Sequence, residues 1–225
     1  MLAQGQVGQP STTSIPPGTQ QVFRQGQMGE LIATELQGRF YENAYRGNLY
    51  SGGGSITALS ANTITLTATT TPIIGVWNPV GSGKNLVILQ AALTCVANNL
   101  TSGAGPGLFV WATSINNGAI STGSTPLNRL TLATSGSVAK YFAGSTALTG
   151  LSNNLVIAET AEFPSPSGLT YTTLGSTALT PGFAATLNLD GQYIVPPGGV
   201  LALLNTTSST TFSCGARMLW NEIPV

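Results

Sequence analysis

The sequence predicts an all-β protein built around an antiparallel β-sandwich, with an extended N-terminal arm and one short helix. Short apolar segments recur between turn residues about every 8 to 15 positions, a spacing typical of sandwiches and closed antiparallel sheets. Several of these segments alternate apolar and polar residues, the period of a strand with one buried face. Because strands and helices do not alternate along the chain, a parallel α/β sheet is disfavoured.

The C-terminal segment, residues 193–225, shows the strand pattern most clearly. It contains two apolar stretches separated by a Ser/Thr-rich tip, which predicts a hairpin that closes a sheet. Pro196 to Gly199 predicts a turn before the first stretch, because proline lacks an N–H and glycine accepts positive φ. In the second stretch the side chains predicted to face one way are Phe212, Cys214, Ala216, Met218 and Trp220, and those predicted to face the other way are Thr211, Ser213, Gly215, Arg217 and Asn221.

The N-terminal residues 1–26 are rich in Gln, Gly, Pro and Thr, and their single charged residue is Arg24. Such a segment has too few apolar residues to fold alone, so we expect an unstructured arm that becomes ordered on an assembly partner. Residues 27–50 are richer in charged and aromatic residues. They predict a short helix near 39–46 that ends at Gly47, since glycine is the usual residue after a helix C-terminus.

We therefore predict two parts, an assembly-docking arm with its helix over residues 1–50 and a β-domain over residues 51–225, joined by the flexible segment Ser51-Gly52-Gly53-Gly54. The nearly continuous apolar run 86–96 predicts a central strand covered on both faces. Asp190-Gly191 predicts a hairpin turn. The remaining strands are predicted at 63–68, 73–77, 108–113, 127–132, 138–142, 155–157, 169–173 and 184–189.

The composition points to a protein with covered surfaces. Charged residues make up only 6% of the chain and the formal net charge is zero, whereas soluble monomers usually carry about a quarter charged residues. The hydrophobic content of 42% is too high for a disordered chain. The sequence contains no run of about 18 apolar residues, so it predicts no membrane span. The N-terminus lacks the basic and apolar stretches of a secretory signal.

The two cysteines are both predicted to lie in the core. Cys95 shares strand parity with Val87, Leu89 and Leu93, and Cys214 shares it with Phe212 and Trp220. A disulfide between them is open, but a protein made without a secretory signal favours buried free thiols.

The sequence offers little chemistry. Histidine is absent, which removes Ser-His-Asp and Cys-His catalysis and the commonest metal ligand. Gly81-Ser82-Gly83-Lys84 is half of a phosphate-binding loop, but no helix pattern follows it. Glu159 and Glu162 are better explained by a solvated loop than by a glycosidase pair. The seven basic residues form no stripe for nucleic acid. We predict no enzyme activity, no cofactor and no metal.

Four segments, GRFYENAYRGNLYSGGG, NPVGSGKNLVIL, VPPGGVLALLN and MLWNEIPV, resemble virion proteins of tailed bacteriophages. The resemblance implies a jelly-roll-like β-sandwich with an N-terminal arm, of the kind that decorates or cements capsids or forms head appendages. It also implies homotrimers bound to the major capsid protein or other virion proteins, assembled in the host cytoplasm. It carries no catalytic residue.

These observations together predict a non-enzymatic capsid decoration protein whose arm and sandwich bridge neighbouring subunits, without nucleic-acid or membrane contacts. The alternative is a tail-fibre or adsorption module that binds a host receptor or glycan, for which the tryptophans and tyrosines could form a face. The residues predicted at the assembly interface are Arg24, Arg39, Phe40, Tyr41, Tyr45, Arg46 and Tyr50.

Overall fold

The chain divides into two units, residues 1–42 and residues 43–225. The computed structural model describes residues 5–7, 23–25, 38–56, 71–97, 108–115, 123–134, 136–144, 148, 151–161, 163, 182–206 and 212–225. Within these ranges, no helix is long and apolar enough to cross a membrane. The predicted strands 63–68 and 169–173 lie outside the described residues.

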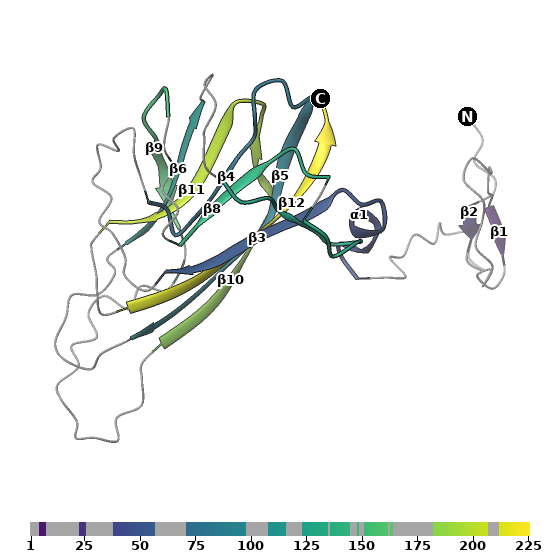
Figure 1. Cartoon of the computed structure of the whole chain (residues 1–225). Coiled ribbons are helices and arrows are strands. Elements are labelled where there is room, and N and C mark those ends of the chain that lie inside the picture. The colour runs from purple at the N-terminus through teal and green to yellow at the C-terminus, as the bar shows by residue number, and fades with distance from the viewer. Residues whose placement is uncertain are drawn as a thin grey trace. The chain divides into compact units, whose positions relative to one another are not determined.

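The second unit is a β-sandwich of two antiparallel five-stranded sheets (Figure 1). The first sheet has the order β10-β5-β12-β3-β7, and the second has the order β8-β4-β11-β6-β9. Strands of the first sheet are β10 (Gly182–Val195), β5 (Lys84–Ala97), β12 (Phe212–Pro224), β3 (Leu49–Ile56) and β7 (Leu127–Asn128). Strands of the second sheet are β8 (Lys140–Ala143), β4 (Ile74–Trp77), β11 (Gly199–Asn205), β6 (Phe109–Ile115) and β9 (Val156–Thr160).

The strand pairing has the connectivity of a jelly roll. Four strands from the first half of the sandwich pair in reverse order with four from the second half: β3 with β12, β4 with β11, β5 with β10, and β6 with β9. This is a long hairpin rolled into two sheets. Strands β7 and β8 extend the sheets beside β3 and β4. The predicted jelly-roll-like sandwich is therefore confirmed.

The main core lies between the two sheets. Trp111 from the second sheet and Trp220 from the first are both buried there, and the Trp111 ring lies 5.8 Å from that of Tyr193. A second apolar cluster, which includes Trp77 and Phe142, packs around Leu148, Leu151 and Leu155. Every residue of β11 and of its neighbour β4 is buried, so both strands are covered on both faces.

The prediction that 86–96 is covered on both faces is wrong. Register shifts in β5 leave Leu89 without a partner on β12, because Ile88 pairs with Trp220 and Gln90 pairs with Leu219. Such a bulge reverses the side-chain alternation. The buried residues of β5 are accordingly Leu86, Ile88, Ala91, Leu93 and Cys95, whereas Val87 and Leu89 are half-buried.

The predicted terminal hairpin is also wrong. Strands β11 and β12 lie in different sheets, so the chain crosses from one layer to the other between them. The predicted alternation of β12 holds for Cys214, Ala216, Met218 and Trp220, which are buried. The side chain of Phe212 lies outside the described residues.

The turn predicted at Pro196 to Gly199 is confirmed. The Gly199 N–H donates to the Pro196 carbonyl at 2.8 Å, and Gly198 has a φ of 83°. The turn predicted at Asp190-Gly191 does not reverse the chain. Residues on both sides of it pair with β5, so it is a bulge within β10.

The predicted flexible joint is wrong, since Ser51 to Gly54 belong to β3. A Cβ atom at Gly52 would overlap the Tyr141 ring of β8, and one at Gly54 would lie 2.8 Å from the Ala143 Cβ. These glycines therefore let the edges of the two sheets approach closely. A Gly-Gly-Gly run within a strand is unusual, because glycine weakens isolated strands.

The predicted helix is present as α1 (Tyr41–Tyr45). Gly47 has a φ of 73°, its N–H donates to the Ala44 carbonyl at 3.0 Å, and the Asn48 N–H donates to the Asn43 carbonyl at 3.1 Å. This pair of bonds is a Schellman motif, which confirms Gly47 as the residue that ends the helix.

Cys95 and Cys214 form a disulfide, so the favoured interpretation of free thiols is wrong. The two residues are directly opposite each other on β5 and β12, with Cα atoms 4.1 Å apart. Their predicted burial is correct, with exposed fractions of 0% and 1%. The disulfide that the sequence left open is the alternative that the structure shows, and the register of β5 and β12 brings the two residues together.

Candidate functional site

The predicted interface residues occupy different environments. Arg24 belongs to β2 (Phe23–Gln25), which pairs in parallel with β1 (Gly5–Val7), and its side chain lies outside the described residues. In the first unit, the Arg39 guanidinium lies 5.4 Å from the Phe40 ring centre, and Tyr41 is exposed.

In the second unit, Tyr45 and Arg46 are exposed at the end of α1. Tyr50 differs from them, because it is 4% exposed and packs in the main core. An exposed aromatic beside a cation can contact a partner, whereas Tyr50 contributes to the stability of the sandwich.

A tight turn follows β7 at one edge of the first sheet. We call residues 128–133 the Leu132 turn. The Asn128 side chain holds it: its Oδ1 accepts from the N–H groups of Leu130 and Thr131 at 2.9 and 3.2 Å, and its Nδ2 donates to the Gly47 carbonyl at 2.8 Å. The Leu132 N–H also donates to the Asn128 carbonyl at 3.0 Å. Asn128 is buried, so these bonds are shielded from water.

The Leu132 turn displays two leucines. Leu130 is 50% exposed and Leu132 is 70% exposed. Leu132 has a φ of 57°, a left-handed conformation that costs a bulky side chain about 1–2 kcal/mol. The hydrogen bonds of Asn128 offset that cost, so a strained backbone presents an apolar side chain to solvent. The strand predicted at 127–132 is therefore wrong beyond Asn128, because the apolar pattern of these residues is typical of a strand and does not reveal the turn.

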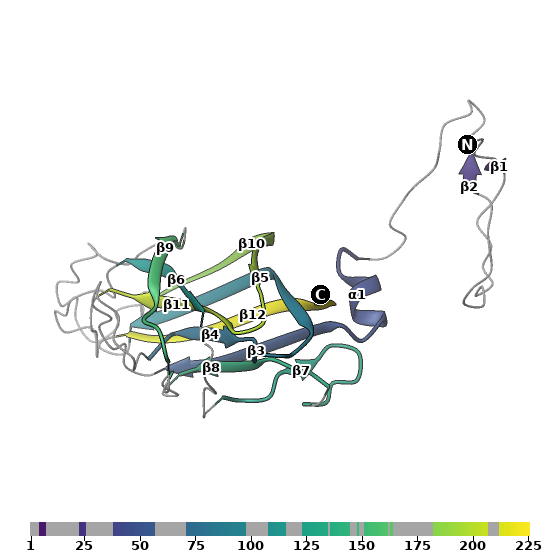
Figure 2. The same ribbon diagram turned by 90° about the horizontal axis from the view of Figure 1, so that it is seen from above.

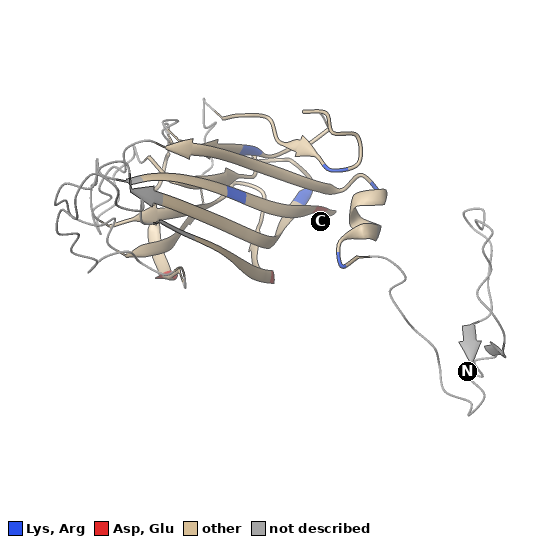
Figure 3. Cartoon of the chain, turned by 90° about the horizontal axis from the view of Figure 1, so that it is seen from below, with Lys and Arg blue, Asp and Glu red and all other residues tan. Residues whose placement is uncertain are grey.

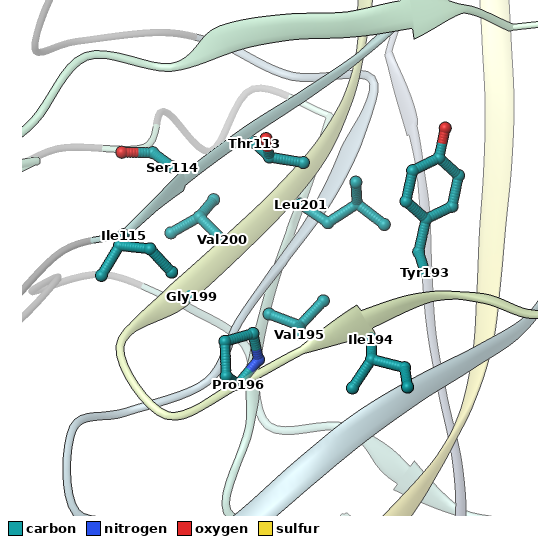
Figure 4. A pocket seen from close by; sticks show the side chains of 10 residues that line it. All are labelled: Thr113, Ser114, Ile115, Tyr193, Ile194, Val195, Pro196, Gly199, Val200 and Leu201. Atoms are coloured by element: carbon teal, nitrogen blue, oxygen red, sulfur yellow. The ribbon is translucent and has the colours of Figure 1, made fainter.

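An apolar pocket of roughly 280 Å³ lies at the opposite edge of the first sheet, beside β10 (Figure 4). We call it the β10 pocket. Ile115 from β6 and Ile194 from β10 flank it, and they are 50% and 58% exposed. Its lining residues are Thr113, Ser114, Ile115, Tyr193, Ile194, Val195, Pro196, Gly199, Val200 and Leu201. This lining contains no charged side chain, so the pocket suits an apolar group.

A second, more polar pocket of roughly 270 Å³ lies between β9 and β10, where Trp111, Leu187 and Leu189 meet Glu159, Thr160, Asn188 and Gln192. Next to it, the Tyr193 hydroxyl donates a hydrogen bond to the Glu159 carboxylate. Burial, and then this bond and the nearby negative charge, raise the pKa of Tyr193 above its usual range. Tyr193 therefore stays neutral and acts as a hydrogen-bond donor.

The Gly81-Ser82-Gly83-Lys84 segment is a turn that leads into β5, where Gly81 and Gly83 have positive φ. This agrees with the sequence, which favoured a turn rather than a phosphate-binding loop. The Lys84 Nζ lies 3.0 Å from Glu222 Oε2, and Ser137 Oγ donates to Glu222 Oε1 at 2.6 Å. Glu222 is 1% exposed. Lys84 therefore neutralises a buried carboxylate, which is a structural role.

The loop predicted for Glu159 is wrong, since Glu159 is an exposed residue of strand β9, and Glu162 lies outside the described residues. Among the described residues, no group of three or more His, Cys, Asp or Glu could hold a metal ion.

The middle of the outer face of the first sheet carries few charges, and few positions on the strands of this sheet are coloured as charged in Figure 3. Register and alternation place on this face Thr186 and Asn188 of β10, Gln90, Ala92 and Thr94 of β5, Gly215, Arg217 and Leu219 of β12, and Ser51, Gly53 and Ser55 of β3. Of these, Leu219 and Ser51 are buried. Arg217 carries the one charge among these residues, and its Nη2 donates to Gln90 Oε1 at 2.6 Å.

No protein-family model matches this chain, and comparison with curated proteins and with solved structures finds no match.

Proposed function

We propose that this chain is a non-enzymatic structural protein of a tailed-phage virion, which decorates or cements the capsid by bridging neighbouring subunits. The observation that carries the proposal is the middle of the outer face of the first sheet, where Arg217 is the one charge among mostly small, neutral side chains of the residues named above. A protein that must stay apart from its neighbours normally displays many charges.

The chemistry of this face favours a large protein interface. Burying an ionised side chain without a partner is costly, whereas Ser, Thr, Gly and Ala are desolvated at a much smaller cost. Small side chains such as Gly53, Gly215 and Ala92 also keep the sheet surface flat, so a neighbouring subunit can approach it closely. These properties suit a subunit of a shell.

The described residues near α1 support an additional contact. Tyr41 and Tyr45 are 47% and 65% exposed, and aromatic side chains are enriched in protein interfaces. Residues 1–37, which belong to the predicted assembly-docking arm, contain only Arg24, Glu30 and Glu35 as charged residues, and we propose that they extend the interface over a neighbouring subunit.

The test is co-sedimentation of the full-length protein with phage heads that lack it. Thr94→Glu and Thr186→Glu place new charges on the outer face at exposed positions, so each variant should fold and bind heads at least about tenfold more weakly. Asn154→Glu, an exposed position beside β9, is the matched control and should bind normally. Normal binding by both face variants would contradict the proposed surface.

The polar pocket beside Tyr193 favours a second candidate, a glycan-binding module of a tail fibre or adsorption apparatus. A carboxylate, two amide side chains and an apolar floor can receive the hydroxyls and ring of a sugar. This function predicts binding of the wild-type chain to host cells without any phage particle. Glu159→Gln should weaken that binding, whereas head binding should be unchanged.

A further inference from the structure

We propose that copies of this chain associate head-to-tail, with the Leu132 turn of one copy inserted into the β10 pocket of the next. The proposal rests on the proposed assembly function and deepens it, because it names the contact between copies. Both features belong to the sandwich unit, and each is built within one chain.

The positions of the two features require a directional contact. In the first sheet, β7 and β10 form opposite edges, and Figure 2 shows β10 and β7 on opposite sides of β5, β12 and β3. The Leu132 turn follows β7, and the β10 pocket lies beside β10. Contacts between two different patches repeat from copy to copy, and they close into a ring or continue as a filament.

The apolar surfaces are complementary. Leu130 and Leu132 project from the turn, and Ile115 and Ile194 flank the pocket, so at least half of each of these four side chains is exposed in the isolated chain. Strained backbone is often retained where it serves function, and this strained turn displays two exposed leucines next to each other. Insertion of Leu132 into the pocket removes all four side chains from water.

The charges around the two features are also complementary. Arg129 is exposed within the Leu132 turn. Glu159 accepts the hydrogen bond of Tyr193, which lines the β10 pocket, and Asp190 is an exposed residue on β10, the strand that also provides Ile194. The only other acidic side chain that the structure describes is Glu222, which is buried. Because the charges at the two edges have opposite signs, contact between the β7 edge of one copy and the β10 edge of the next is favoured over contact between two identical edges.

The experiment measures the mass of the full-length chain by light scattering and native mass spectrometry. Leu132→Asn removes the apolar side chain and retains a residue that tolerates positive φ, so the turn should keep its shape. Ile194→Lys replaces a largely exposed apolar side chain with a charged one, and it places a positive charge opposite Arg129 of the next copy. Each variant should weaken self-association about 10- to 100-fold, the range associated with burying one large apolar side chain.

Leu108→Asn is the matched control. Leu108 is 56% exposed. It lies just before the first residue of β6, whereas the pocket residue Ile115 is the last residue of that strand. This variant removes an exposed leucine outside both features, so it should associate like the wild type. Circular dichroism and urea unfolding should show that all three variants remain folded.

Mixing the two defective variants tests the direction of the contact. Leu132→Asn keeps an intact pocket and Ile194→Lys keeps an intact turn, so one good contact can form between them. We expect a 1:1 heterodimer with wild-type affinity per contact, and no larger closed assembly. A contact made by identical patches predicts no such dimer.

The proposal is overturned if the wild type is monomeric up to high micromolar concentration, if both variants associate like the wild type, or if the mixture gives no heterodimer. These outcomes are separate from the head-binding test. Failure of Thr94→Glu and Thr186→Glu to change head binding would contradict the proposed cement surface, and leave the contact between copies measurable in the absence of heads.

Discussion

Loss of the Cys95–Cys214 disulfide should lower stability more than any single surface change. The bond connects positions 119 residues apart, so it closes a loop that includes most of the sandwich. In the chain-entropy model, a loop of about this length restricts the unfolded state by about 5 kcal/mol. Both sulfur atoms are buried, so the native sheet should survive reduction with its packing largely unchanged.

The assay is equilibrium unfolding in urea of the full-length chain, with and without a reductant, because reduction removes the bond and no atoms of the core. We expect a fall of about 3–5 kcal/mol in the free energy of unfolding. The Cys95→Ala/Cys214→Ala variant should fall slightly further, since two buried sulfur atoms are also lost.

A reduction effect below about 1 kcal/mol would refute this reasoning, because the unfolded chain would then not be restrained by the bond. Thiol titration of the oxidised protein in denaturant supplies the direct check. Two reactive thiols there would show that the cysteines are not paired at all.

Three further predictions concern the sheet edge, the buried ion pair and Tyr193. Gly52→Ala should destabilise the fold by about 1–3 kcal/mol, measured by thermal unfolding, since its methyl group overlaps the Tyr141 ring; an unchanged melting temperature would contradict the close approach. Lys84→Met should cost about 3 kcal/mol because it leaves Glu222 buried without its cation, and adding Glu222→Gln should restore part of the loss. The pKa of Tyr193 is raised in the folded state, so above a pH of about 10 the unfolded chain loses this proton while the folded chain keeps it. The stability that is fully present below that pH is therefore lost as the pH rises, and the wild type should lose stability more steeply than Tyr193→Phe.

The fold class was predictable from the sequence because it depends on local periodicity. Cys214, Ala216, Met218 and Trp220 alternate without interruption, so the buried face of β12 could be assigned residue by residue. The turn at Pro196 and the end of α1 at Gly47 were predictable for the same reason, since each depends on the backbone preference of one or two residues.

Long-range features were not predictable in this way. The bulge at Leu89 looks like any other apolar position in the run 86–96, yet it changes which side chains of β5 enter the core. The assignment of β11 and β12 to different sheets depends on their partners, β4 and β5, which local patterns do not reveal. The composition of Gly52 to Gly54 predicts a flexible segment, because the Tyr141 ring that requires Gly52 is distant in sequence.

The candidate site shows the same division. Tyr45 and Arg46 were identified by their composition and are exposed, whereas Tyr50, from the same aromatic cluster, is buried by the sheet. The Leu132 turn had no recognisable signal, because its left-handed residue is a leucine and its hydrogen bonds come from Asn128. The β10 pocket requires β6, β10 and β11 to meet, so only the tertiary structure reveals it.

The rolled connectivity has a consequence for biosynthesis. Strand β12, the last strand of the sandwich to leave the ribosome, is inserted between β5 and β3, two strands made much earlier. Strands β5 and β3 both lack their shared neighbour β12 until translation of the sandwich is nearly finished. Folding of this domain during translation should therefore stop at an incomplete first sheet, and most of the folding should occur after release from the ribosome. A chain that stops at residue 211 should consequently aggregate or be degraded, even though it contains more than nine-tenths of the sequence.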